Sequence, residues 1–170
     1  MDAPGSAPPR FPPAHADAVR ARILDAFRRL DTRILVCSAA CGADQMALEA
    51  AGALGVTRRV ILPFAQARFR QTSVVDRGAE WGEPFDRTMA ELGAANAVMT
   101  LEGSGDETAA YADANLAILD DAQKLARASG GGVIAMLVAE AEAAYEGMKD
   151  SFAQEAKKRG LPIVWIPTKA

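Results

Sequence analysis

The sequence contains a single histidine, His15, and two cysteines, Cys37 and Cys41, among its 170 residues. His15 is far along the chain from any serine that could act as a nucleophile, which argues against a Ser-His-Asp or Cys-His device. One histidine, with no group of carboxylates around the two thiols, also argues against a zinc site. The cysteines are four residues apart, and we expect reduced, buried thiols rather than a disulfide.

Excess basic charge and long apolar runs are missing as well. The net charge is −3, so there is no general electrostatic case for binding nucleic acid. No apolar run approaches the length of a membrane span, and the N-terminal residues lack the apolar core of a signal peptide. Neither a Walker sequence nor a GxGxxG fingerprint is present. We therefore expect a cytoplasmic protein with no membrane partner.

Proline, glycine and apolar residues divide the chain. Five of the nine prolines lie within the first 13 residues, which predicts an irregular arm over residues 1–14 and a single domain over residues 15–170. Short apolar stretches predict strands at 34–37, 59–62, 97–101, 133–138 and 162–166. Helical spacing between them predicts helices at 15–30, 46–54, 83–95, 107–128 and 141–159, whereas residues 64–78 show no clean period and are expected to form a loop. Alternating strands and helices are typical of an α/β protein with a parallel sheet.

The segment from Ile34 to Leu54 carries the clearest functional pattern. Its apolar strand is followed by a run of small residues, from Ser38 to Ala43, and then by a helix. This arrangement presents free backbone N–H groups at a helix N-terminus, where they and the helix dipole favour an anion, most often a phosphate. Small side chains let a ligand approach the backbone, and Gly42 can adopt a left-handed conformation.

Several polar residues near this segment have two interpretations. Asp44 could cap the free N–H groups of its helix, or it could accept hydrogen bonds from a ribose or a base. Tyr111 and Asn115 are four residues apart and share a helical face, where they could stack on and hydrogen-bond to a base or simply lie on the surface. Asp106 could cap the long helix. Ser73 is a plausible phosphate contact if the 63–78 segment closes over the site.

The residues from Ser38 to Ala50 resemble the ligand loop of the SLOG superfamily, which includes Smf/DprA proteins and LOG-type phosphoribohydrolases. The resemblance is strongest to a stand-alone bacterial branch and extends over most of the chain. It includes an Asp-Ala-Pro-Gly arm at the start, Leu62-Pro63-Phe64 after the second strand, and the segment from Tyr111 to Asn115. It implies a Rossmann-like three-layer sandwich with a mostly parallel sheet, binding or sensing a nucleotide or a nucleotide-derived molecule.

The chain departs from this family in two ways. The family has a strand and a short loop before the arm, and this chain starts at the arm, so the resemblance predicts that one strand and part of the pocket are missing. The hydrolases carry a PGGxGTxxE motif with a catalytic glutamate, which the segment from Gly103 to Thr108 does not match. We therefore assign no catalytic residue and no metal.

The expected ligand lies where the segments 38–44, 63–78 and 102–111 leave the carboxyl edge of the sheet. The expected contacts are Ser38, Ala39, Ala40, Gly42, Ala43, Asp44, Pro63, Phe64, Ser73, Gly103, Asp106, Tyr111 and Asn115. No cofactor is implied beyond a nucleotide-type ligand, and the apolar helices would permit a homo-oligomer. Two alternatives stay open: a nucleotide-processing hydrolase that uses Asp44, Asp106 or Glu107 as acid or base, and a single-strand DNA binder, which the acidic charge disfavours.

Overall fold

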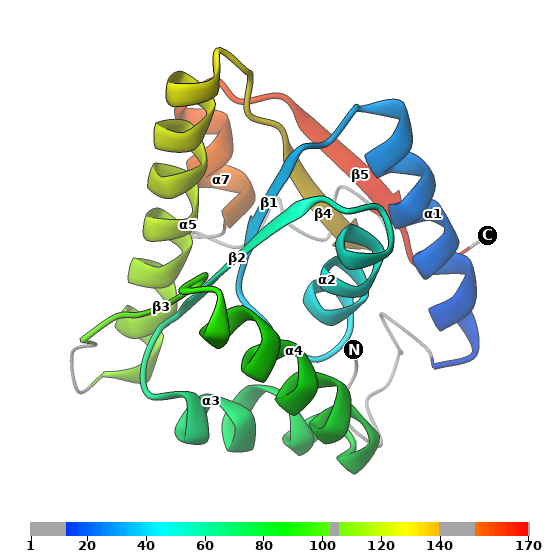
Figure 1. The fold of residues 1–170 in the computed structure, drawn as a ribbon, viewed down its shortest axis with the longest axis vertical. Coiled ribbons are helices and arrows are strands. Elements are labelled where there is room, and N and C mark those ends of the chain that lie inside the picture. The colour runs from blue at the N-terminus through cyan, green and yellow to red at the C-terminus, as the bar shows by residue number, and fades with distance from the viewer. Residues whose placement is uncertain (1–12, 103–105, 140–151, 170) are drawn as a thin grey trace.

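The computed structural model describes residues 13–102, 106–139 and 152–169 (Figure 1). The strands are β1 (Ile34–Cys37), β2 (Thr57–Leu62), β3 (Val98–Thr100), β4 (Ala135–Ala139) and β5 (Ile163–Pro167). The α-helices are α1 (Ala16–Arg29), α2 (Ala43–Ala53), α3 (Gln66–Ser73), α4 (Gly82–Ala94), α5 (Glu107–Ser129) and α7 (Phe152–Lys158). Short 3-10 turns are η1 (Pro13–His15), η2 (Val75–Arg77) and η3 (Ala79–Trp81).

All strand pairs in the described part of the chain are parallel, which confirms the α/β class and the Rossmann-like layering. The strands form two hydrogen-bonded groups, β1-β2-β3 and β4-β5. Within the first group Cys37 is opposite Val60, and Leu62 is opposite Thr100. A division into two groups was not expected from the sequence, because apolar periodicity locates a strand but does not identify its neighbours.

Neighbouring residues of β2 show how the first sheet is covered on both faces. The Arg58 guanidinium pairs with Glu91 of α4, whereas Arg59 Nε donates to Asp121 Oδ2 of α5 at 2.6 Å. Successive side chains of a strand point to opposite faces, so α4 and α5 cover opposite faces of this sheet. The main core lies on the α2 and α4 side, where Val60 and Leu62 are at most 1% exposed.

The first helix holds the two ends of the described chain together. α1 packs against α2 and β5. The His15 ring Nδ1 donates to the main-chain carbonyl of Thr168 at 2.9 Å, and Arg22 Nη1 donates to the carbonyl of Pro167 at 2.7 Å. The buried stripe of α1 is formed by Val19, Ile23, Ala26 and Phe27. Val19, Ile23 and Phe27 recur at helical spacing, which is the pattern that predicts this helix from the sequence.

The expectation of a loop over residues 64–78 is wrong. This segment contains α3 and the turn η2. Phe69 is the one buried residue of α3, and a helix with a single buried position has no apolar period to detect. The helix predicted at 141–159 is described only from Phe152 onward, and residues 140–151 lie outside the described part, as do Met1–Pro12 of the predicted arm.

Both cysteines are free thiols, as the sequence led us to expect. Burial raises the pKa of each thiol above its ordinary value, most strongly at Cys37. Neither is therefore a thiolate nucleophile at neutral pH. No helix in the described residues combines the length and apolar character needed to cross a membrane.

Candidate functional site

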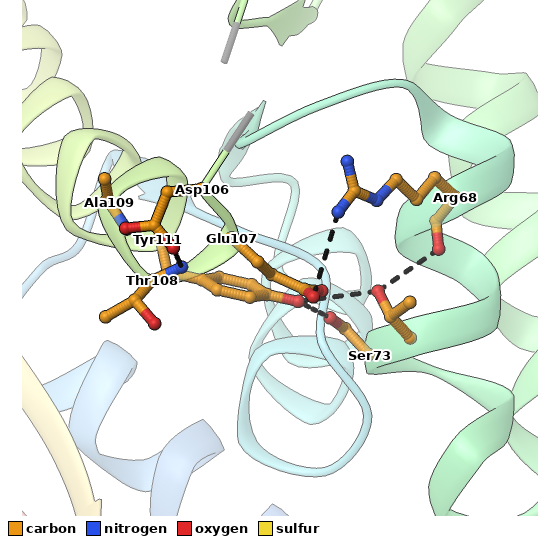
Figure 2. A network of polar contacts seen from close by, with 8 residues as sticks. Arg68, Ser73, Asp106, Glu107, Thr108, Ala109 and Tyr111 are labelled. Atoms are coloured by element: carbon orange, nitrogen blue, oxygen red, sulfur yellow. Dashed lines mark hydrogen bonds and ion pairs between the residues drawn. The ribbon is translucent and has the colours of Figure 1, made fainter. Parts of the chain in front are cut away.

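Three segments that follow neighbouring strands meet at the carboxyl edge of the first sheet. The Cys41 N–H, in the loop after β1, donates to the main-chain carbonyl of Ser73 in α3 at 2.9 Å. The hydroxyls of Ser73 and Tyr111, the latter in α5, are hydrogen-bonded to each other (Figure 2). Parallel α/β sheets bind ligands at this edge, so we place the candidate site here.

The N-terminus of α2 is left open by its own sequence. Its N-cap is Gly42, whose φ of 88° is in the positive region that favours glycine and which has no side chain to accept a hydrogen bond. The first intrahelical bond runs from the Met46 N–H to the Gly42 carbonyl at 3.0 Å. The N–H groups of Ala43, Asp44 and Gln45 have no acceptor among the described residues. This terminus therefore has the donors and the dipole that bind an anion.

The start of α5 differs from the start of α2. The Asp106 carboxylate accepts hydrogen bonds from the N–H groups of Thr108, at 3.2 Å, and Ala109, at 3.3 Å (Figure 2). The capping interpretation of Asp106 is therefore confirmed. Two of the α5 donors are already satisfied, so α2 provides the better anion site of the two helices.

Asp44 does not cap α2. Its Oδ2 accepts a hydrogen bond from the Ala40 N–H at 3.1 Å and so fixes the small-residue loop from inside. Burial raises the Asp44 pKa to about 6, although the Ala40 N–H favours the ionised form. A carboxyl group with this pKa changes charge just below neutral pH.

Because its pKa is raised, Asp44 should make the protein more stable at lower pH, whereas a carboxylate with a lowered pKa does the opposite. The folded state binds the Asp44 proton more tightly than the unfolded state does, so this group adds stability as the pH falls from above 6 toward 4. Asp44→Asn keeps an acceptor for Ala40 and stays neutral. Urea unfolding measures the free energy of unfolding of Asp44→Asn relative to that of the wild type. We expect this difference to be greatest at pH 8 and about 1–2 kcal/mol lower at pH 5.

Asp86→Asn is the matched control for this measurement. Hydrogen bonds from the Arg70 guanidinium hold the pKa of Asp86 below its usual value, so Asp86 stays ionised throughout the range from pH 5 to pH 8. Its variant should differ from wild type by a constant amount over that range. An equal pH dependence in the two variants would contradict the assignment to Asp44.

Aromatic and charged side chains lie beside this loop. The Tyr111 ring meets Phe64 edge-on with their centroids 5.6 Å apart, and the Arg68 guanidinium carbon is 4.4 Å from the Phe64 ring centroid. Arg68 also reaches Glu107 at 3.8 Å, and both side chains are about half exposed (Figure 2). The site therefore combines aromatic rings, a cation and open backbone donors.

The expected ligand residues fall into three groups. Those that the hydrogen bonds and ring contacts bring together are Ala40, Asp44, Phe64, Ser73 and Tyr111. Those next to them in the chain and partly or fully buried are Ser38, Ala39, Gly42, Ala43 and Pro63. The remaining three are Asn115, whose side chain makes no hydrogen bond within the described part of the chain, Asp106, which caps α5, and Gly103, which lies outside that part.

Gln45 is not among the ligand residues expected from the sequence. This residue is only 4% exposed, and neither Nε2 nor Oε1 of its amide has a partner among the described residues; the same is true of the Ser38 hydroxyl. Buried polar groups are normally hydrogen-bonded, so an unpartnered amide in the first turn of α2 and an unpartnered hydroxyl directly after β1 are unusual. A glutamine within a run of small and apolar residues was the signal that could have revealed it.

Comparison with known proteins gives no match. No protein-family model, no curated protein and no solved structure matches the chain. The candidate site therefore depends on its geometry. In the described residues, no group of three or more His, Cys, Asp or Glu side chains could hold a metal ion.

A cavity of about 390 Å³ lies at the opposite, amino edge of the sheet. Its lining includes Arg58, Glu91 and Asn96. Arg58 pairs with Glu91 there, and Arg59, also in the lining, pairs with Asp121. Carboxylates already neutralise these arginines. An anion would therefore bind less favourably in this cavity than at the N-terminus of α2.

Proposed function

We propose that this protein binds a nucleotide or a nucleotide-derived small molecule at the carboxyl edge of the β1-β2-β3 sheet. The main support is the N-terminus of α2, where three N–H groups have no acceptor among the described residues and the N-cap is a glycine. These donors would hold a phosphate group. Binding or sensing, in the cytoplasm of a bacterial cell, is the role that the SLOG resemblance adds to this proposal.

The other end of the ligand would lie toward α5. Tyr111 and Phe64 present an aromatic pair, and Asn115 has an amide with no hydrogen bond in the described part of the chain. A base could stack on an aromatic ring and bond to an amide, whose donor and acceptor match a base edge. Arg68, which lies over the Phe64 ring, would add a cation at this end of the ligand once it is released from Glu107.

Two measurements test this proposal. Mass spectrometry after denaturation identifies any small molecule that is retained by the purified protein, and calorimetry with AMP and a wider nucleotide panel measures affinity. We expect at least one nucleotide to bind with a stoichiometry of one and to be returned intact. Absence of both a retained nucleotide and binding across the panel would overturn the proposal.

A charge placed at the helix start tests the position of the phosphate. Ala43→Asp puts a carboxylate at the first residue of α2, where it suits the helix dipole but repels an anion. We expect nucleotide affinity to fall at least about tenfold while the free energy of unfolding changes by less than about 1 kcal/mol. Ala53→Asp is the control, because it adds the same charge at the other end of α2, about 15 Å away. Equal losses in the two variants would count against a phosphate at this terminus.

A second function has one observation in its favour. The Asp44 pKa of about 6 is in the range of a general acid or base, so hydrolysis of a bound nucleotide is the alternative. Release of a free base from AMP that is lost in Asp44→Asn, with AMP binding intact, would support this enzyme. Intact AMP after long incubation would exclude it for this ligand.

A further inference from the structure

Ser73 occupies a junction within the site. It is the last residue of α3, and its main-chain carbonyl accepts the Cys41 N–H at 2.9 Å. Its hydroxyl is hydrogen-bonded to the Tyr111 hydroxyl (Figure 2). One residue therefore holds the small-residue loop through its backbone and the aromatic ring through its side chain.

We propose that Ser73 is a positioning residue that couples the two halves of the site, so that the phosphate part and the base part of the ligand bind cooperatively. This inference rests on the proposed nucleotide binding and adds a role that differs from the phosphate contact expected for Ser73. The Ser73 hydroxyl has Tyr111 as its partner, and its carbonyl accepts from the loop. Its hydroxyl and its carbonyl thus each have a partner within the protein.

The coupling follows from how α3 is held. Phe69 is the one buried residue in this eight-residue helix, and Val74 directly after the helix is also buried, so the contacts of Ser73 add to the packing that sets the position of the helix end. A phosphate on α2 orders the loop, and the ordered loop fixes the Ser73 carbonyl through Cys41. The fixed Ser73 hydroxyl then restrains the hydroxyl and ring of Tyr111. A base that binds afterwards loses less conformational entropy, which is positive coupling.

Thermodynamic linkage makes this coupling measurable from either side. If phosphate raises the affinity for a nucleoside by some factor, the nucleoside must raise the affinity for phosphate by the same factor. Inorganic phosphate and adenosine serve as the two probes, each titrated alone and then in the presence of the other. Coupling between sites in proteins is typically fivefold or more, and we expect at least about fivefold in the wild type.

Two substitutions remove the junction and keep its surroundings. Ser73→Ala deletes the hydroxyl and keeps the carbonyl, and Tyr111→Phe deletes the hydroxyl and keeps the ring. We expect the coupling factor to fall close to one in either variant and in the double variant, whatever change each variant makes in the affinity for each probe alone. Ser73→Thr retains a hydroxyl and should retain the coupling.

The outcomes separate this inference from the function on which it rests. If phosphate and adenosine both bind the wild type without affecting each other, the coupling is wrong and the proposed function stands. Ser73→Ala could instead lower the affinity for phosphate, measured without adenosine, about tenfold and leave the coupling factor unchanged. Ser73 would then contact the phosphate directly, and the inference is overturned. If no probe and no nucleotide binds the wild type, the proposed function fails first.

Discussion

Replacing Phe69 by alanine is expected to lower the free energy of unfolding by about 3–5 kcal/mol. Phe69 is 1% exposed, and its ring centroid is 6.2 Å from that of Phe64 and 6.3 Å from that of Phe85. It is also the single buried side chain of α3. The substitution removes a ring from a closed core, and a helix with no other buried residue has nothing to compensate for the loss.

Polar contacts of α3 are too weak to replace this packing. Arg70 bonds to Asp86 of α4 through two contacts of 2.8 Å, but both side chains are partly exposed. Exposed ion pairs contribute about 0–1 kcal/mol. Urea unfolding is the measurement, with Phe69→Leu as the matched control, which should lose less than about 1.5 kcal/mol if the core repacks. A loss below about 1 kcal/mol in Phe69→Ala would show that α3 is held by something else.

Replacing Gly42 by valine has the second largest expected effect. Valine at the start of α2 would block the ligand, and the backbone geometry shows that it would also strain the fold. A φ of 88° strains any residue with a Cβ atom, and a β-branched residue most of all. We expect Gly42→Val to lower the free energy of unfolding by about 1–3 kcal/mol in addition to weakening nucleotide binding.

Gly93→Ala is the matched control for glycine replacement. Gly93 lies in α4, and a Cβ atom there would meet nothing within 4 Å. Alanine favours helix over glycine, so this variant should gain about 0.5–1 kcal/mol in urea unfolding. If the two variants instead change stability in the same direction and by the same amount, the positive φ of Gly42 is not the cause.

Apolar periodicity was sufficient to locate most helices and strands. The long stripe of α1 fixes a helical period, and β1 and β4 are short continuous apolar runs typical of buried strands. The helix α3 was missed because it turns only about twice and buries one side chain. The division of the strands into two groups was not predicted either, because the apolar residues of β1 do not indicate which strand pairs with it.

The candidate site was only partly predictable for a related reason. Gly42 could be identified because glycine at a strand-to-helix turn has few other uses. The partner of Asp44 could not, because the choice between its own helix and the Ala40 N–H depends on the path of the loop. The pairing of Ser73 with Tyr111 joins residues 38 positions apart. Such a contact is fixed by tertiary packing, and neither residue type signals the other.

The hydrogen bonds that join α1 to the end of β5 affect the order in which the chain folds. His15 and Thr168 are 153 positions apart, and Arg22 and Pro167 are 145 apart. The entropy lost in closing a loop of this length must be offset by contacts that already exist. During synthesis β1, β2 and β3 emerge and can pair long before β5 is made. The face of α1 that packs on β5 therefore stays uncovered on the nascent chain until β5 has been synthesised.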